Sequence, residues 1–520
     1  MQQDLTLRVL PSQVDDREAI RQRIAETAAV PLSSITGYYP LKRSIDARGR
    51  QPWVHLTVRA FVGEPFTHRP MQSFAFQDVH QASRQALIIG AGPAGLFAAL
   101  RLLELGVRPV LLERGKDVRS RRRDLAILNK AGEVDPDSNY CFGEGGAGTY
   151  SDGKLYTRSH KRGDVDRILQ LLVRFGAEEN ILYESHPHIG TNKLPQIITA
   201  MRAQILACGG RFFFGQRVSD ILLDKGRVCA VLTASGERFE GDALLLATGH
   251  SARDVFGLLR TRGIQLLFKP FALGVRIEHP QSLIDSIQYH QAVRDAYLPP
   301  AAYGLVEQVQ GRGVFSFCMC PGGIIAPAST APGEVVVNGW SPSKRNNAHA
   351  CSGIVTGIDE ADVAPFAAEG ALAGVAYQSA VEQKAFQAGG GALVAPAQRM
   401  ADFVDGRTST DLPPCSYIPG IRPVSLAEVL PTTVYRGLQD AFVRFGRKMP
   451  GYFTNEAVVV ATESRTSSPV RIPRDPTTLA HPQVSNLYPC GEGAGYAGGI
   501  VSAAMDGERA ATALASALGS

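Results

Sequence analysis

Three glycines near position 90 have the spacing of a site that binds a pyrophosphate. Gly90, Gly92 and Gly95 form G-x-G-x-x-G, in which the first glycine permits a sharp turn and the second lets the backbone approach a phosphate without an intervening Cβ. The third lets a helix pack closely on the preceding strand, and that helix offers free N–H groups to the phosphates. Glu113, about 20 residues downstream, can accept a hydrogen bond from a ribose hydroxyl and would repel a 2′-phosphate. The pattern predicts a dinucleotide site that disfavours NADP; a purely structural glycine turn is the alternative.

The residues around these glycines predict the elements that must position them. Ala86–Ile89 is short and apolar, as in a buried strand, and the apolar segment after the third glycine predicts a helix to about Leu105. Gly106 ends that helix where a C′ glycine is common, and Pro109–Leu112 predicts a second buried strand that ends at the acid. Because strand, turn, helix, strand and acid occur in register, the motif is stronger than the glycines alone.

Several segments resemble those of the glutathione-reductase-like flavoproteins. They are GAGPAGLFAAL, LLERG, ATGHSARDVF (Ala247–Phe256) and YPCGEGAGYAGGI (Tyr488–Ile500). Three more are similar to a bacterial family of FAD-dependent, or NAD(FAD)-utilizing, dehydrogenases: FGEGGAGTYSDGKLYTR (Phe142–Arg158), CMCPGG (Cys318–Gly323) and ESRTSSPVRIPRD (Glu463–Asp475). The resemblance covers nearly the whole chain. It implies non-covalently bound FAD and does not indicate a substrate.

The resemblance also implies which residues contact FAD. They are Gly90, Gly92, Pro93, Ala94, Gly95, Glu113, Arg114, Gly146, Ala147, Thr149, Asp152, Val218, Thr248, Gly249, Gly491, Glu492, Gly498, Gly499 and Ile500. Val218 would meet the adenine through its backbone, and Glu492, where many relatives have Asp, would bind a ribityl hydroxyl. The final helix, which begins near Ile500, would direct its N-terminus at the flavin and stabilise negative charge on reduction.

Two further residues could take part in chemistry at the flavin. Lys154 would lie near the flavin ring, where a cation stabilises the anionic reduced form; a surface charge is the alternative. His188, in the loop HPHIGTNK (His186–Lys193), could supply an acid or base, although a loop histidine is more often structural or exposed.

Cys318 and Cys320 raise the question of a redox disulfide. At positions i and i+2 of a strand they would lie about 6.6 Å apart, near the limit for bridging, and the cysteine pair that disulfide reductases carry beside the first helix is absent. Cys320 could be a thiol near the flavin or a buried packing residue. Arg465 or Arg471 could hold a substrate carboxylate through two hydrogen bonds, or could pair with Asp475.

The composition indicates a soluble globular protein of two or three domains. The 520 residues are 44% hydrophobic and 20% charged, and the net charge of +5 does not by itself indicate nucleic-acid binding. The N-terminus lacks the features of a signal peptide, and no apolar stretch predicts a membrane span. The eight scattered cysteines are typical of the reducing cytoplasm. No cluster of residues has the spacing of metal ligands, so no metal site is expected.

The order of predicted elements gives an α/β protein in three parts. Residues 1–80 show a β-α-β-β pattern, which predicts a small α+β module. Basic residues cluster around its hairpin: Lys42, Arg43, Arg48 and Arg50. They could contact RNA or another anionic partner, or they could simply be exposed to solvent. Residues 84–270 and 457–520 form a discontinuous FAD-binding domain of the Rossmann type, and residues 271–456 form an inserted α+β cap that holds the substrate.

Three local predictions belong to this division. The segments 211–214, 217–223, 228–234 and 237–239 alternate like a four-stranded β-meander, and residues 362–388 predict one Ala-rich helix. The basic run Arg119–Arg123 is expected on a solvated helix face, with contact to phosphates as the alternative.

The expected function is an FAD-dependent oxidoreductase that transfers a hydride between FAD and a small-molecule substrate. A single dinucleotide motif is visible, so NAD(P)H would visit the flavin transiently, or the substrate itself would deliver the hydride. The alternatives are a flavin-dependent RNA-modifying or RNA-binding protein that uses the N-terminal module, and a flavin-binding scaffold without turnover. The sequence leaves the substrate and the oligomeric state open.

Overall fold

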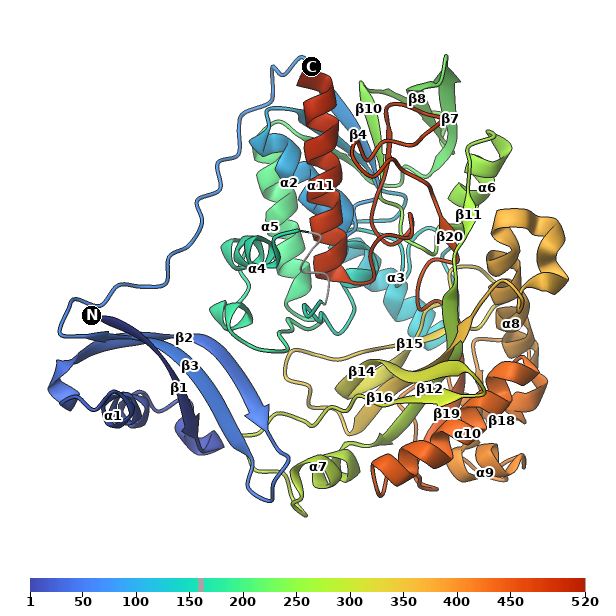
Figure 1. The fold of residues 1–520 in the computed structure, drawn as a ribbon. Helices are drawn as coiled ribbons and strands as arrows, with labels where there is room; N and C mark the ends of the chain where they lie inside the picture. The colour runs from blue at the N-terminus through green and yellow to red at the C-terminus, as the bar shows by residue number, and fades with distance from the viewer. Residues whose placement is uncertain (158–162, 520) are drawn as a thin grey trace.

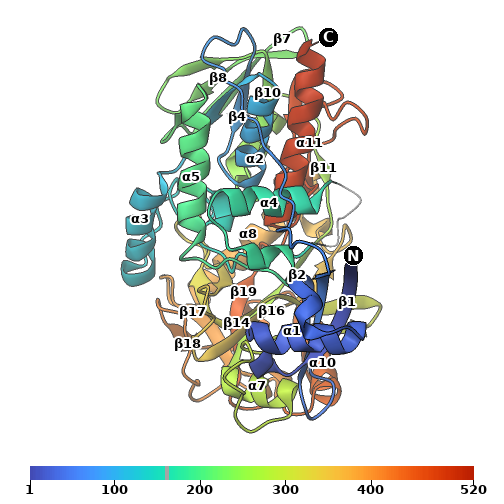
Figure 2. The ribbon, with the colours of Figure 1, turned by 90° about the vertical axis from the view of Figure 1, so that its left-hand side faces the viewer.

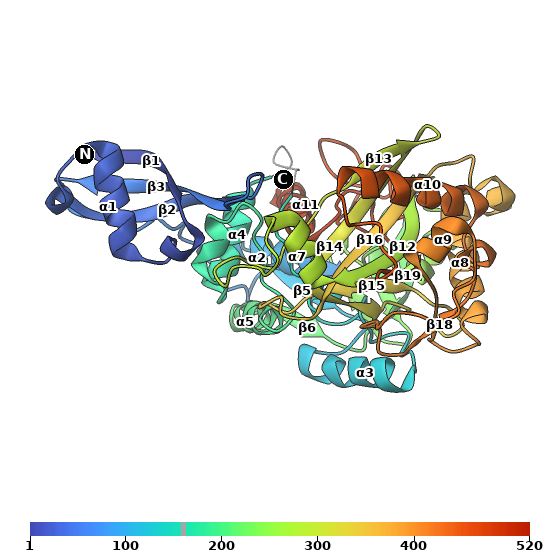
Figure 3. The ribbon, with the colours of Figure 1, turned by 90° about the horizontal axis from the view of Figure 1, so that it is seen from below.

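The N-terminal part of the chain forms a small sheet that lies to one side of the molecule (Figures 1 and 3). In the computed structural model, which describes residues 1–157 and 163–519, its strands pair in the antiparallel order β1-β3-β2 and enclose a separate core with one helix. The elements are β1 (Gln2–Val9), α1 (Arg17–Ala28), β2 (Ile35–Asp46) and β3 (Trp53–Val62). Asp16 caps the first turn of α1. The β-α-β-β order is the predicted one. Arg158, the last residue of the glycine-rich motif, lies outside the described residues.

The second part is built on a five-stranded parallel sheet in the order β21-β10-β4-β5-β6. Its strands are β4 (Gln85–Ile89), β5 (Arg108–Leu112), β6 (Arg211–Phe213), β10 (Ala243–Leu246) and β21 (Leu487–Pro489). The strand before the glycine motif therefore lies in the middle, and the last strand of the chain lies at one edge. Because the strands are parallel, the turns that follow β4, β10 and β21 gather at the same edge of the sheet.

Both faces of this sheet are buried. Helices cover one face: α2 (Pro93–Glu104), α4 (Val165–Arg174), α5 (Leu194–Ala207) and α11 (Ile500–Gly519) (Figure 2). The other face packs against a smaller antiparallel sheet and one helix: β7 (Val218–Asp224), β8 (Arg227–Thr233), β9 (Arg238–Glu240) and α6 (Arg253–Thr261). Along β4, Ala86 and Ile88 face the helices while Leu87 and Ile89 face the smaller sheet. This two-sided burial explains why the strand is apolar at every inner position.

The third part contains an eight-stranded sheet in the order β13-β14-β16-β12-β19-β17-β18, with β15 paired to β14. The strands are β12 (Phe271–Pro280), β13 (Val306–Val309), β14 (Arg312–Pro327), β15 (Val337–Trp340), β16 (His349–Ile358), β17 (Ala395–Arg399), β18 (Ile421–Pro423) and β19 (Val458–Glu463). The helices are α7 (Gln281–Tyr289), α8 (Ala373–Ala388), α9 (Met400–Asp405) and α10 (Thr432–Lys448). A short ribbon of β11 (Leu267–Phe268) and β20 (Val470–Arg471) connects this part with the parallel sheet.

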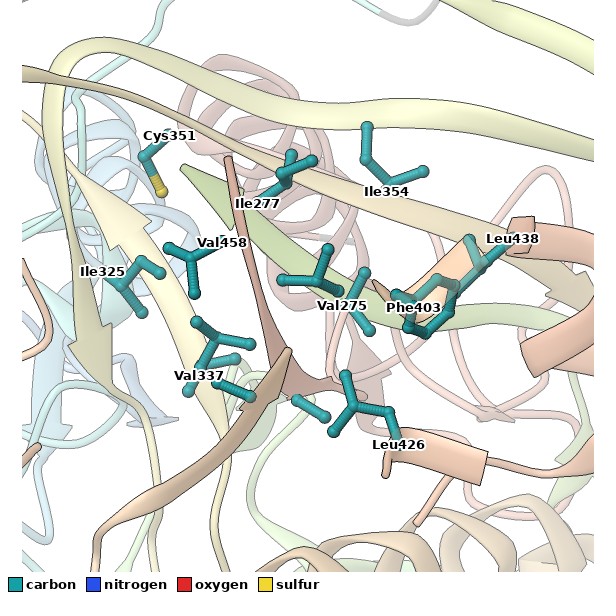
Figure 4. Packing of buried hydrophobic residues seen from close by; sticks show 14 of the residues in the cluster. Val275, Ile277, Ile325, Val337, Cys351, Ile354, Phe403, Leu426, Leu438 and Val458 are labelled. Carbon is teal, nitrogen blue, oxygen red and sulfur yellow. The ribbon is translucent and has the colours of Figure 1, made fainter. Parts of the chain in front are cut away.

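Alternate residues of the central strands fill the core of this third part. Val275 and Ile277 of β12, Val458 of β19, Phe403 of α9 and Leu438 of α10 belong to one cluster of buried apolar side chains (Figure 4). The helices α8, α9 and α10 lie together at one end of the molecule (Figure 3). This core holds the eight-stranded sheet in place. Strands β14 and β15, which belong to the same sheet, carry side chains toward the glycine turns of the parallel sheet.

Three predictions about these elements were wrong. The segment 211–213 pairs in parallel with β5 and so belongs to the large sheet, which leaves a three-stranded meander. β19 pairs with β12 and β17, so the chain leaves the cap after Glu463 and the predicted boundary at Ala457 comes too early. The predicted helix 362–388 is a 3₁₀ segment, Ala364–Leu372, followed by α8, because Gly370 adopts a φ of 57° that breaks a helix.

Among the described helices, none is both long enough and apolar enough to cross a membrane.

Candidate functional site

A cavity of about 420 Å³ lies where the glycine turns of the parallel sheet meet strands β14 and β15 of the cap. Most residues predicted from the sequence line it: Gly90, Gly92, Pro93, Ala94, Glu113, Arg114, Gly146, Ala147, Asp152, Lys154, Val218, Thr248, Gly249, Arg465, Gly491, Glu492, Gly498, Gly499 and Ile500. Five do not: Gly95, Thr149, His188, Cys320 and Arg471. The structure thus brings segments from both ends of the chain to one wall.

The three glycines of the motif have different surroundings. Gly90 has a φ of 101°, and a Cβ there would lie 2.4 Å from the Ala247 carbonyl oxygen. A Cβ at Gly95 would lie 2.0 Å from the Gly90 oxygen. A Cβ at Gly92, by contrast, would have its nearest non-neighbouring atom, Gly146 Cα, at 3.8 Å. Packing within the protein therefore requires glycine at the first and third positions, while the second is open toward the cavity.

Two helix N-termini reach the wall beside these turns. α2 begins after Gly92, and no side chain caps its first N–H groups. The turn at Gly491 adjoins it, because a Cβ at Gly491 would lie 3.0 Å from Ala94 Cβ. α11 begins at Ile500, which also lines the cavity. Two positive helix ends thus face one space, an arrangement that suits an anionic ligand.

Glu113 holds three turns together beneath the cavity. Its Oε2 accepts a hydrogen bond from Ala91 N at 2.9 Å, and its Oε1 accepts bonds from Gly115 N at 2.9 Å and Gly143 N at 3.0 Å. The side chain is only 4% exposed, yet the residue forms part of the wall. Its carboxylate is therefore a structural acceptor as well as a candidate ligand group.

Arg121 supports the wall of the cavity from behind, whereas the prediction placed it wrongly on a solvated face. It is fully buried and donates hydrogen bonds to the carbonyl oxygens of Asn139 (2.8 Å), Tyr140 (2.9 Å) and Glu144 (2.9 Å), which shapes the glycine-rich loop. The signal was available, because Val118, Arg121, Leu125 and Leu128 of α3 (Val118–Ala131) share one helical face. Thr149, also buried, donates to the Glu144 carbonyl oxygen at 2.7 Å within the same loop.

Asp152 and Lys154 connect this loop to the cap. Asp152 is buried: its Oδ1 accepts a hydrogen bond from Ser341 Oγ, and its Oδ2 accepts one from Arg345 Nη2 at 2.9 Å and lies 3.4 Å from Lys154 Nζ. Burial opposes ionisation of Asp152, but Lys154 and Arg345 outweigh it and lower its pKa. Lys154 Nζ also donates to Cys318 Sγ at 3.7 Å and Cys320 Sγ at 3.5 Å. Lys154 is therefore an ionised group on the wall and is partnered by acid and sulfur.

The histidine on the wall is His250, which the prediction did not single out although it belongs to the ATGHSAR turn. Its Nε2 lies 3.6 Å from Glu492 Oε2. Burial lowers the pKa of His250 to about 4 and raises that of Glu492 to about 7. His188 instead lies behind the wall, with Nε2 3.1 Å from the Ser343 carbonyl oxygen, and burial lowers its pKa. Both imidazoles are neutral at physiological pH.

Neither arginine suggested for a substrate carboxylate pairs with Asp475. Arg465 lies on the wall, but its guanidinium donates to Glu382 (3.0 and 3.1 Å), to Glu334 (2.6 Å) and to Thr330 Oγ1 (2.6 Å). Arg471 is exposed and stacks on Tyr496, 5.4 Å from its ring centroid. The expected pairing was wrong because the cap supplies buried acids to Arg465.

Of the two cysteines, the one that faces the cavity is not the one that the prediction from the sequence singled out. Cys318 lines the cavity, whereas Cys320, the residue proposed from the sequence, is fully buried behind it. In the part of the chain that the structure describes, no group of three or more His, Cys, Asp or Glu side chains could hold a metal ion.

Comparisons with known proteins give the cofactor. A family model described as an FAD binding domain matches residues 83–138, and one described as the C-terminal domain-like part of an FAD-dependent protein matches residues 270–466. Residues 1–61 match a domain of unknown function. An uncharacterized protein of Clostridium beijerinckii is 36% identical over 515 residues, which cover 96% of each chain. These matches show that the cofactor is FAD. They do not decide the dehydrogenase or glutathione-reductase-like placement, which stays a prediction.

Among solved structures, similarity is weak. The flavin-dependent brominase Bmp2 is 12% identical with a TM-score of 0.37, over 84% of this chain and 79% of that one. A geranylgeranyl bacteriochlorophyll reductase-like protein from Thermoplasma acidophilum is 13% identical with a TM-score of 0.35, over 84% and 79%. TM-scores this low support no conclusion about fold or activity.

Proposed function

This chain belongs to the protein family that includes the Clostridium beijerinckii relative, and we propose that it is an FAD-dependent oxidoreductase that transfers a hydride between bound FAD and a small-molecule substrate. One observation carries the proposal: the glycine turns of the FAD-binding segment and the cap residues Phe317, Cys318, Asn338 and Trp340 line the same cavity. A cofactor held at the turns would share this space with a substrate held by the cap, as hydride transfer requires.

The residues of the cavity fit FAD. The open position at Gly92 and the uncapped N-terminus of α2 supply N–H groups and clearance for the pyrophosphate. Glu113 would accept a bond from the adenosine ribose, and the Val218 backbone would meet the adenine. Glu492 would bind the ribityl chain, with the N-terminus of α11 at the flavin end. FAD, when bound, supplies the ring that accepts or donates the hydride.

Ionised and neutral groups on the cavity wall would then have separate tasks. Lys154 supplies a fixed positive charge, which its pairing with Asp152 maintains. Neutral His250 can accept a hydrogen bond from a substrate hydroxyl or amine, while Glu492 beside it titrates near neutral pH. NAD(P)H is a candidate transient hydride donor in place of the substrate.

The RNA-binding alternative receives less support from the N-terminal sheet. Of the hairpin's basic residues, Arg43 pairs with Glu184 and Arg48 with Asp46. These ion pairs reduce the positive field that a nucleic acid would need.

Anaerobic reduction of the FAD-loaded protein tests the proposal. NADH, NADPH or a member of a metabolite panel is expected to bleach the flavin absorbance, and a protein that retains FAD but is reduced by none of them would be a scaffold without turnover.

Gly92→Ala gives the same experiment a structural control. Because no protein atom obstructs the new Cβ, the free energy of unfolding should not fall, while a phosphate at the turn would be displaced and the Kd for FAD should rise at least about tenfold. Gly49→Ala, at another unobstructed glycine in the N-terminal sheet, should change neither quantity. Normal FAD affinity in Gly92→Ala would contradict the assigned pyrophosphate position.

A further inference from the structure

Two sulfur atoms meet at the cap side of the cavity. Cys318 Sγ lies 4.0 Å from Cys320 Sγ, although a regular strand would hold residues i and i+2 apart. The strand is not regular here: the pairing of β14 with β16 shifts register between Phe317 and Cys320, and Cys318 has a φ of 47°. A bulge of this kind changes the direction of a side chain and is common next to active sites. The spacing argument from the sequence therefore does not apply.

Two cations, one of them buried, lie beside the pair. Lys154 Nζ lies within hydrogen-bonding distance of both sulfur atoms, at 3.7 Å from Cys318 and 3.5 Å from Cys320. Fully buried Arg276 donates to the Cys318 carbonyl oxygen at 3.0 Å. The hydrogen bond from Cys320 lowers the pKa of the Cys318 thiol, Lys154 and Arg276 lower it further against the effect of burial, and the pKa of Cys320 rises correspondingly. These shifts favour a thiolate at Cys318 and a protonated thiol at Cys320, the state from which dithiols react.

The two sulfurs also differ in access. Cys318 lines the cavity that we assign to FAD, whereas Cys320 is fully buried behind it. Electrons that enter or leave the pair would pass through Cys318, and Cys320 would act as its resolving thiol.

We propose that Cys318 and Cys320 form a redox-active pair that cycles between dithiol and disulfide and exchanges two electrons with FAD. In the oxidative direction the Cys320 S–H bond breaks, one S–S bond forms, and the pair releases two electrons and one proton. Oxidised FAD takes up the two electrons and the proton, so atoms and charge balance. The sulfurs must approach from 4.0 Å to about 2 Å to form this bond. The inference rests on the proposed function, because it requires FAD in the cavity.

Counting electrons tests this directly. The oxidised, FAD-loaded protein, titrated anaerobically with dithionite, should take up about four electrons per FAD, two for the flavin and two for the disulfide. Cys318→Ser and Cys320→Ser should each take up about two. Cys229→Ser removes an exposed thiol that does not line the cavity and should leave the wild-type count unchanged.

Mass spectrometry of the unmutated protein provides a second measurement that does not depend on the variants folding. Both cysteines lie in one tryptic peptide, 313–344, which contains no other cysteine. After oxidation with ferricyanide this peptide should resist alkylation and be about 2 Da lighter than its dithiol form, and dithionite should restore two alkylation sites.

The outcomes separate the two proposals. Uptake of about two electrons by wild-type protein that contains FAD, with both thiols still alkylated after oxidation, would overturn the dithiol pair and leave the flavoenzyme proposal intact. A preparation that never takes up FAD would overturn both.

Discussion

Glu113 has a structural role in addition to the binding role that we propose for it. The sequence places an acid at the end of β5, and the spacing predicts that it faces a ribose. The structure adds three backbone N–H groups, from Ala91, Gly115 and Gly143, that already bond to its two oxygens. The first two donors are close in sequence to the motif, but Gly143 belongs to a loop whose path depends on Arg121. Local spacing could not show that contact.

Glu113→Gln should therefore weaken the fold as well as FAD binding. The amide nitrogen of glutamine would replace an acceptor and face a backbone N–H group, which should lower the free energy of unfolding by about 1–3 kcal/mol. Urea denaturation followed by circular dichroism measures this. Glu360→Gln, at an exposed turn, is the matched control and should have no effect. Unchanged stability with loss of FAD would mean that the carboxylate serves the ligand alone.

At the scale of elements, buried acids join helices of the cap to the segment that leads back to the parallel sheet. Glu382 of α8 is fully buried and pairs with Arg253 of α6 and Arg465 beyond β19. The sequence predicts α8 and the apolar strands from their composition and periodicity. It does not reveal which arginine meets which acid, because the partners are far apart in the chain. For the same reason, the prediction assigned the segments of β6 and β19 to the wrong part of the protein, because each pairs with a strand that is far away in the sequence.

Arg465→Met and Arg471→Met distinguish a structural arginine from an exposed one. Removing Arg465 leaves buried Glu382 and Glu334 short of a partner and should lower the free energy of unfolding by about 3–5 kcal/mol. Arg471 is exposed, so its replacement should change stability by less than about 0.5 kcal/mol. Urea denaturation measures the free energy of unfolding of both variants. Equal values for the two would contradict a stabilising role of the buried network around Arg465.

The same network predicts an acid dependence. Although burial opposes it, Arg253 and Arg465 hold the pKa of Glu382 below its ordinary value of 4.5. The unfolded chain therefore binds a proton more readily, so the contribution to stability is complete above about pH 4.5 and is lost as the pH falls below it. Glu382→Gln should show a shallower decrease of stability in this acid range than the wild-type protein.

At the scale of the molecule, the N-terminal sheet is an attachment with its own core. It contacts the FAD-binding part through the edge of β2, where Arg43 N donates to the Tyr183 carbonyl oxygen at 2.7 Å and Ser185 N donates to the Arg43 carbonyl oxygen at 2.9 Å. The sequence predicts its elements correctly, because the strands alternate and the helix has a capping acid. Its docking position depends on these backbone bonds and on the Arg43–Glu184 ion pair, which join residues far apart in the sequence and cannot be predicted from periodicity.

Deletion of residues 1–63 should leave the cofactor site intact. Apolar residues of the first core do not extend into the cores around the parallel sheet, and residue 63 follows β3 directly. The shortened protein is expected to bind FAD with the Kd of the full chain, measured by flavin fluorescence quenching. Loss of FAD from a folded, shortened protein would show that the N-terminal sheet shapes the cavity.

Strands β10 and β21 pair in the parallel sheet although they are far apart in the sequence, and this has a consequence for the order in which the protein is made. The whole eight-stranded cap is translated between these adjacent strands, and α11, which packs on α2, is translated only after β21. On the ribosome, α2 therefore exposes its apolar face until α11 has been made. A nascent chain that stopped just before Ile500 would contain the complete cap and yet lack the 20-residue helix that packs on α2.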